Sequence, residues 1–304
     1  MSDAASPSTQ APTTTLGDPR WLVPLSLLAM YVIWGSTYLG IRYALVSYPP
    51  FLLAALRFAI AGTLLFTILR VRGVALPTRR QWRNAAVVGT LLLAGGNGLV
   101  CFAEQSVSSG IAAVAVASMP LFAAVFSSLY GERPSRGETI GLALGFVGVV
   151  VLNLGAGLSG SPLGAAALIV AAIAWAFGSV WSKGQDMPKG PMNTAAQMLC
   201  AAVALIIIAL LHGERLPEHP QWSATFALGY LVVFGSIVAF SAYLYVLKTV
   251  RPALATSYAY VNPPVAVLFG VALGGEHVGP FDLAGMAIIL VGVGIITMMR
   301  TRKA

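Results

Sequence analysis

Long apolar runs separated by short polar joins dominate this sequence. Each run has about 20 residues and few or no charges, which is the length an α-helix needs to cross the hydrocarbon core of a bilayer. The pattern predicts ten transmembrane helices, at residues 22–41, 51–69, 84–105, 109–130, 136–154, 162–182, 191–211, 223–247, 251–273 and 281–299. We therefore expect an all-α membrane protein.

The second half of the chain repeats features of the first. The matching residues, at offsets of 140 and then 144, are Gln81, Trp82, Gly89, Pro120, Gly131, Glu132, Gly141 and Gly148 with Gln221, Trp222, Gly229, Pro264, Gly275, Glu276, Gly285 and Gly292. Five helices in each half is an odd number, so equivalent helices cross the membrane in opposite directions. We predict two inverted repeats, at 21–155 and 160–299, flanked by a disordered tail at 1–20 and a basic tail at 300–304. Secondary transporters with such repeats bind their substrate near the midplane.

Composition and charge agree with a membrane protein. The chain is 58% hydrophobic and only 9% charged, whereas about a quarter of residues are charged in soluble domains. Its net charge of +8 does not indicate nucleic-acid binding, because the basic residues lie at the ends of the apolar runs. All but Arg42, Arg57 and Arg215 of the 18 Lys and Arg residues fall on the side of the two termini. The positive-inside rule then predicts that both termini are cytoplasmic.

Prolines interrupt two corresponding helices. Pro263 and Pro264 lie inside the segment 251–273, and Pro120 lies inside 109–130. Proline has no N–H and collides with the carbonyl four residues earlier, so we expect helix breaks that leave the carbonyls of Ala259 and Tyr260 free. Interrupted helices at equivalent positions of two repeats mark the central site of a transporter.

Polar and aromatic side chains recur at helical spacing within several apolar runs. Shared faces are expected for Tyr31, Trp34 and Tyr38; Asn97, Cys101 and Glu104; Trp175, Ser179 and Ser182; Ser236, Phe240 and Tyr243; and Tyr258 and Asn262. Such groups either line a cavity or join neighbouring helices by hydrogen bonds. Taken together, they favour a cavity lined by aromatic rings.

Arg57 and Glu104 are the two ionisable residues expected below the lipid headgroups. A lone charge at that depth is costly, and such residues usually pair or line water. Both lie toward the same side of the membrane, so a structural ion pair is one interpretation. A gate or a contact with a substrate carboxylate is the other.

Glycines form faces on two helices, with Gly141, Gly145 and Gly148 on one and Gly285 and Gly292 on the other. Glycine faces let helix backbones approach closely. They predict either packing inside the bundle or a homodimer interface, so the chain is expected to be a monomer or a homodimer.

The sequence lacks the patterns of several other classes. It has no phosphate-binding loop of the G-x-x-x-x-G-K-[ST] type. Its three histidines lie outside the apolar runs, and Cys101 and Cys200 have no paired spacing. These features argue against an intramembrane metalloprotease or serine hydrolase. We expect no metal, no catalytic residues and no cofactor.

Particular motifs resemble those of EamA-type exporters of the drug/metabolite transporter superfamily. They are Ile33-Trp34-Gly35-Ser36-Thr37, Leu56-Arg57-Phe58, residues 109–122, Gly131-Glu132-Arg133-Pro134-Ser135, and residues 252–275. The resemblance implies ten helices in two inverted repeats around a central cavity. It implies cavity positions at Trp34, Tyr38, Asn97, Ser118, Trp175, Ser179, Ser236, Tyr243, Tyr258 and Asn262.

The expected function is outward transport of a small metabolite by alternating access, in the inner membrane of a bacterium. The cargo implied by the resemblance and by the aromatic lining is an amino acid, aromatic or apolar. Drug efflux is the alternative, and sugar-phosphate or nucleotide-sugar exchange is disfavoured because Arg57 alone could meet a phosphate. A membrane-embedded enzyme or a channel is the alternative outside the transporters. The expected partners are the lipid bilayer and the substrate, without nucleic acid.

Overall fold

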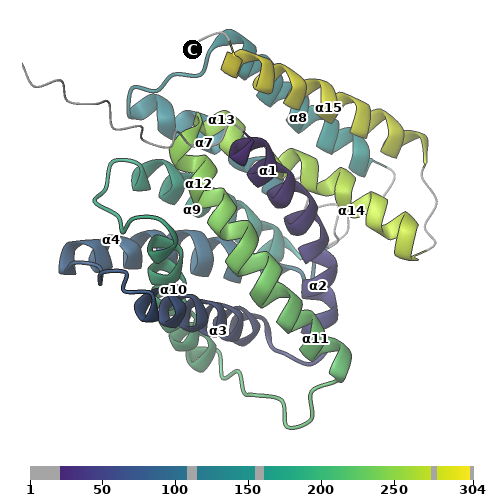
Figure 1. The fold of residues 1–304 in the computed structure, drawn as a ribbon. Helices are drawn as coiled ribbons and strands as arrows, with labels where there is room; N and C mark the ends of the chain where they lie inside the picture. The colour runs from purple at the N-terminus through teal and green to yellow at the C-terminus, as the bar shows by residue number, and fades with distance from the viewer. Residues whose placement is uncertain (1–20, 108–114, 155–160, 275–278, 302–304) are drawn as a thin grey trace, which may run out of the picture.

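The chain forms a bundle of ten successive helical stretches (Figure 1). The computed structural model describes residues 21–107, 115–154, 161–274 and 279–301, and all the regular structure in these ranges except an isolated bridge at Val107 is helical. The first half comprises α1 (Leu22–Ala29), η1 (Met30–Trp34) and α2 (Gly35–Leu45); α3 (Pro50–Val71); α4 (Arg79–Gly89), η2 (Thr90–Gly98) and α5 (Leu99–Ala103); α7 (Met119–Leu129); and α8 (Arg136–Asn153). The second half comprises α9 (Pro162–Ser182); α10 (Pro191–Leu211); α11 (Trp222–Tyr230), η3 (Leu231–Val238) and α12 (Ala239–Thr249); α13 (Pro252–Ala255) and α14 (Tyr258–Gly274); and α15 (Pro280–Thr301).

The ten predicted helices are thus confirmed, and their ends follow local chemistry. Proline, which suits the first turn of a helix, begins α3, α9 and α10. Capping boxes begin α4 at Thr78 and α8 at Ser135. The predicted tail at 1–20 and residues 109–114 of the fourth predicted helix lie outside the described residues, as do residues 302–304.

Packing of the helices follows the repeat. The second helix of each half packs against its counterpart, α3 on α10, and so does the fifth, α8 on α15. In addition, α9 packs on η2 in the same way as α1 and α2 pack on α12 and α11. Exchanging the two halves therefore preserves the pattern of neighbours.

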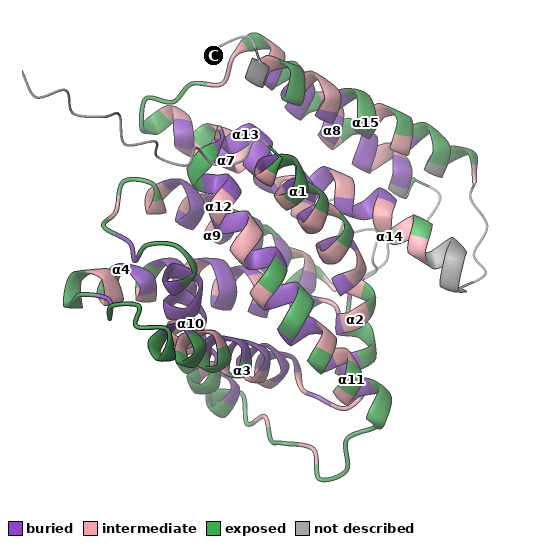
Figure 2. Cartoon of the chain, in the orientation of Figure 1, coloured by how far each residue is buried: buried purple, intermediate pink, exposed green. Residues whose placement is uncertain are grey.

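Within the described residues, six of the helical stretches are both long and apolar enough to cross a membrane by themselves. Leu64 and Ile68 of α3 and Leu290 of α15 are among the large apolar side chains exposed on the outside of the bundle. Buried residues gather on the faces that the helices turn toward one another (Figure 2). An apolar exterior of this kind suits lipid rather than water.

Glycines bring α8 and α15 into backbone contact. A Cβ at Gly292 would lie 2.7 Å from the Gly145 nitrogen and 2.8 Å from the Gly141 oxygen. A Cβ at Gly148 would lie 2.8 Å from the Ile289 nitrogen. These glycine faces therefore pack within one chain, so they do not form the homodimer interface left open by the sequence.

The helix break in the ninth stretch does not lie where the prolines predict it. α14 continues through Pro263 and Pro264, and the interruption is at Thr256 and Ser257, between α13 and α14. There the Thr256 hydroxyl donates to the Pro252 carbonyl at 2.8 Å and the Ser257 hydroxyl donates to the Leu254 carbonyl at 2.8 Å. Such local bonds compete with the helical ladder, so the chain turns at the hydroxyl residues. In the fourth stretch, a turn at Ser118 precedes α7, whose first turn contains Pro120.

Polar contacts hold together the joins at each end of the bundle. At one end, Gln81 donates to the Asp186 carboxylate at 3.0 Å, which connects α4 to the join at 183–190. At the other, the Leu52 backbone N–H donates to Glu214 at 2.7 Å, which connects α3 to the join at 212–221. We call the first of these the basic end, because most Lys and Arg residues lie there.

The contact between α8 and α15 gives a stability prediction. Gly292→Ala should force the two helices apart at a cost of about 1–3 kcal/mol, lowering the thermal unfolding midpoint in detergent micelles by several degrees. Gly294→Ala, on the same helix, is the control, because a Cβ there would meet no atom of another described helix within 4 Å. Equal midpoints for the two variants would contradict the close packing.

Candidate functional site

A cavity lies between the two halves, bordered by the first, third, fourth, sixth and ninth helical stretches. It holds about 580 Å³ of empty space, its open mouth included. The lining comprises Trp34, Thr37, Tyr38, Ile41, Gly96, Asn97, Val100, Val116, Met119, Ala171, Ala172, Trp175, Tyr258 and Asn262. Along the first stretch it extends from Trp34 toward Arg42, away from the basic end.

Aromatic rings form the wall of this cavity. The Trp34 ring lies 4.6 Å from the ring of Tyr258 and 5.7 Å from that of Trp175, both in edge contacts. Tyr243 lies behind them, 5.4 Å from Trp34 and 5.6 Å from both Trp175 and Tyr258. The Trp34 indole N–H donates to the Gly235 carbonyl at 3.0 Å, which fixes that ring. Edge contacts at these separations are favourable for aromatic pairs, so the wall is built in advance of any ligand.

Small residues make room for the aromatic wall. A Cβ at Gly96 would collide with the Trp175 ring. Ala171 and Ala172 line the same side of the cavity. The space beside Trp175 therefore depends on residues without long side chains.

The polar groups of the cavity include two amides and the phenol of Tyr38. Asn97 and Asn262 line it from opposite halves of the chain, together with Tyr38. The Asn97 Oδ1 accepts a hydrogen bond of 3.2 Å from the Arg57 guanidinium. The Asn262 Oδ1 is buried and has no hydrogen-bond partner in the described part of the chain. An unpaired buried acceptor is costly, so this oxygen is available to a ligand.

Six of the ten predicted cavity residues line this space, namely Trp34, Tyr38, Asn97, Trp175, Tyr258 and Asn262. The other four are not among the lining residues, since their polar groups bond within the protein. Ser179 donates to the Trp175 carbonyl at 2.6 Å and contacts the Tyr243 hydroxyl at 2.5 Å. Ser236 accepts from Arg57 at 2.7 Å. Ser118 donates to the Ala115 carbonyl at 2.5 Å, at the turn before α7.

Sequence reasoning missed several lining residues, most of them apolar. Thr37 lies on the face of Trp34 and Tyr38 and Ile41 extends it by one turn, so their spacing was a usable signal. Met119 lies 3.7 Å from the Tyr258 hydroxyl through its sulfur. Val116, like Met119, lies in a largely apolar segment, where no polar pattern distinguishes the cavity face.

Arg57 and Glu104 do not form an ion pair. The two ion pairs in the described residues involve neither of them. Arg57 instead bonds Ser236 and Asn97. Both carboxylate oxygens of Glu104 are buried without a hydrogen-bond partner among those residues. The ion pair, one of the two interpretations of the sequence, is therefore not formed in this structure, where the guanidinium bonds neutral oxygens on two other helices.

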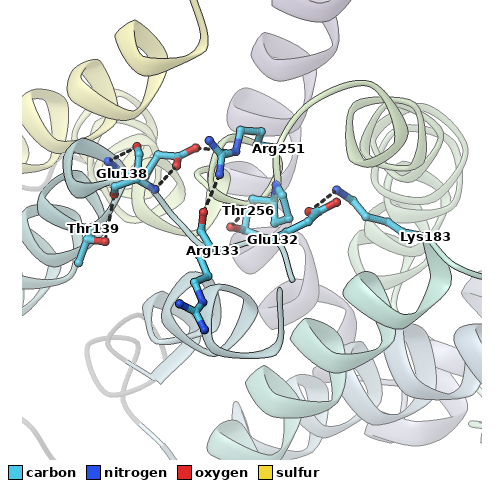
Figure 3. Close-up of polar contacts among 9 residues, drawn as sticks. Glu132, Arg133, Glu138, Thr139, Lys183, Arg251 and Thr256 are labelled. Atoms are coloured by element: carbon cyan, nitrogen blue, oxygen red, sulfur yellow. Dashed lines mark hydrogen bonds and ion pairs between the residues drawn. The ribbon is translucent and has the colours of Figure 1, made fainter. Parts of the chain in front are cut away.

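A second polar cluster joins the two halves at the basic end (Figure 3). The Arg251 Nε lies 3.1 Å from the Glu138 carboxylate, and its Nη2 donates to the Arg133 carbonyl at 2.9 Å. Lys183 lies 3.5 Å from Glu132. The Glu138 side chain is 5% exposed and that of Glu132 is 54% exposed, so the Arg251 contact is the stronger of the two.

No group of three His, Cys, Asp or Glu residues that could bind a metal occurs in the described ranges. Cys101 and Cys200 are free thiols. The cavity offers aromatic faces, amides and hydroxyl groups, which are groups that bind a ligand without changing it covalently.

Comparison with known proteins agrees with this arrangement. A family model described as the EamA-like transporter family matches residues 21–154 and, a second time, residues 162–298. The chain is 48% identical over 282 residues to the Escherichia coli K12 protein named uncharacterized inner membrane transporter YedA, with 92% of each chain covered. It is 25% identical over 292 residues to the uncharacterized transporter YoaV of Bacillus subtilis, covering 92% of this chain and 98% of the relative.

A solved crystal structure shares the fold. It matches with a TM-score of 0.76 at 24% sequence identity, covering 93% of this chain and 99% of the other. The two family matches cover both halves of the duplication and almost the whole chain. The chain therefore belongs to the EamA-like transporter family and is a multi-pass transporter of the inner membrane, not an enzyme.

Proposed function

We propose that this transporter exports amino acids with aromatic or other large apolar side chains. The observation that carries the proposal is the aromatic wall of the cavity, where Trp34, Trp175 and Tyr258 meet edge to face. Rings arranged in this way can stack on a planar side chain or contact a branched apolar one. The amides of Asn97 and Asn262 supply the few polar contacts that orient a small ligand.

The proposed cycle is alternating access between two inverted repeats. The distribution of Lys and Arg supports a cytoplasmic basic end, with both termini on that side. The exchange-symmetric packing of the helices supports repeats related by a two-fold axis in the membrane plane. With this orientation, the Glu138 and Arg251 contact closes the cytoplasmic side while the cavity extends toward the opposite one.

The substrate would lie beside the two helix breaks. The turn at Thr256 and Ser257 directly precedes Tyr258, and the turn at Ser118 directly precedes Met119. Both Tyr258 and Met119 line the cavity. Chain segments that leave the regular helix expose backbone polar groups, which suits binding of an ammonium group near these turns.

Counterflow in liposomes tests the cargo. Liposomes that contain the purified protein and are loaded with unlabelled L-phenylalanine, L-tryptophan or L-leucine should accumulate the same amino acid in labelled form. Charged amino acids should not compete with this uptake. Trp175→Leu should lower exchange by about tenfold, since it removes a ring from the wall. Trp222→Leu should leave exchange unchanged, because Trp222 is 79% exposed and lies outside the cavity. Exchange of cationic dyes or sugar phosphates without amino acids would overturn the proposed cargo.

Cysteine labelling tests the closure of the basic end. Ala253, beneath the Arg251 cluster, is 8% exposed, and Ala253→Cys in a background with Cys101→Ala and Cys200→Ala provides the reporter. Adding Arg251→Gln should raise its labelling by a membrane-impermeant thiol reagent several-fold, since two contacts between the halves are lost.

The matched control is Lys183→Gln, which removes only the exposed pair with Glu132. Exposed ion pairs contribute little, so labelling should hardly change. Equal labelling in the two variants would show that Arg251 has no part in the closure.

A further inference from the structure

A buried cation lies directly behind the cavity. Arg57 of α3 is only 2% exposed. Its Nε donates to the Ser236 hydroxyl at 2.7 Å and its Nη1 donates to the Asn97 Oδ1 at 3.2 Å. Its Cζ lies 5.1 Å from the centre of the Phe58 ring. These partners satisfy hydrogen bonds, but none of them carries a negative charge.

No carboxylate of the described residues neutralises this guanidinium directly. The ion pairs there are Lys183 with Glu132 and Arg251 with Glu138. The carboxylate of Glu104 is also buried, and it interacts electrostatically with Arg42, Tyr38 and Cys101 without forming an ion pair with Arg57. The carboxylate of Glu214 accepts from backbone N–H groups of α3. The positive charge of Arg57 therefore acts on neighbouring buried groups, where water does not screen it.

Asn97 carries the effect of Arg57 into the cavity. Its Oδ1 faces the guanidinium, because Arg can only donate and the amide oxygen is the acceptor. The amide NH₂ of Asn97 must then point away from Arg57. Asn97 lines the cavity, so its two N–H donors are presented to a ligand there.

We propose that Arg57, acting through Asn97, makes the cavity selective for substrates that carry a carboxylate. This inference rests on the proposed function and names the charged group by which the cargo is recognised. The carboxylate accepts from the Asn97 amide, in the field of the guanidinium. Arg57 is a positioning residue, since it is not among the residues that line the cavity.

The same arrangement disfavours two other classes of cargo. A cationic drug would bring a second positive charge next to a buried one, which costs free energy at low dielectric. A phosphate ester carries nearly two negative charges and is usually met by several donors or cations. Within the described lining of this cavity there is no Lys or Arg side chain.

Two small probes with the same ring and opposite charge test the selectivity. Binding of 3-phenylpropionate and of phenethylamine to the purified protein can be compared by calorimetry. The wild-type protein should bind 3-phenylpropionate about tenfold more tightly or better, as expected for one unbalanced charge near the ligand.

Two variants test whether the preference for the carboxylate probe depends on Arg57 and Asn97. Arg57→Gln should abolish it. Asn97→Asp keeps Arg57 but places a carboxylate against it, so the variant should lose the preference and gain affinity for phenethylamine. A folding defect cannot produce that gain. Arg215→Gln, which alters an exposed cation of the join at 212–221, is the control and should keep the wild-type preference.

The outcomes separate this inference from the proposed cargo. Equal affinity for the two probes in a protein that exchanges L-phenylalanine would overturn the inference alone, as would a wild-type preference retained in both variants. A carboxylate preference without any amino-acid exchange would support the inference and replace amino acids by other carboxylates. Failure to bind either probe, with no exchange, would overturn both.

Discussion

Within a bilayer every backbone N–H and C=O group must find a partner inside the protein. Irregular backbone is therefore tolerated only where other helices surround it, and in this chain the irregular segments cluster around the cavity. They are η1, η2, η3, the turn at Ser118 and the turn at Thr256 and Ser257. π-helical turns are frequent at functional sites. Four of these elements, η1, η2 and the two turns, contain or adjoin residues that line the cavity, and η3 lies behind its aromatic wall. The helices α3, α8, α10 and α15 are regular.

Arg57 connects two of these irregular elements. Asn97 belongs to η2 of the first half, and Ser236 belongs to η3 of the second. Hydrogen bonds from a charged donor contribute about 1.5–3 kcal/mol each. A buried guanidinium between the halves therefore both joins two wide-turn segments and places a positive charge beside the ligand. Gly235, next to Ser236, leaves the space for it, because a Cβ there would lie 2.7 Å from the Arg57 Nη2.

Apolar length was sufficient to predict the ten helices, and aromatic spacing placed Trp34, Trp175 and Tyr258 together, whereas proline chemistry misplaced the break in the ninth stretch. The predicted Ser179 and Ser236 do not face the cavity, because a hydroxyl in a helix can bond a carbonyl or a neighbouring helix instead. The spacing of Asn97, Cys101 and Glu104 assumes a regular helix, whereas η2 has wider turns up to Gly98. The depth of Arg57 in the membrane also did not show in which direction around the helix axis its side chain points. Only the folded structure shows that it bonds Asn97 and not Glu104.

The position of the break in the ninth stretch relates the cavity to the basic end. Arg251, in the polar cluster, and Tyr258, in the cavity wall, are separated only by α13 and the turn at Thr256 and Ser257. Ser257 also bonds the Tyr31 hydroxyl of the first stretch at 2.6 Å. A continuous helix would transmit any movement of Tyr258 as a rigid rod. The break, with its two hydroxyl bonds, instead places Arg251 and Tyr258 at the ends of two separate helices, α13 and α14. Had the break been at Pro263 and Pro264, Tyr258 and Arg251 would lie on one rigid segment, and the cavity wall could not move without moving the closure.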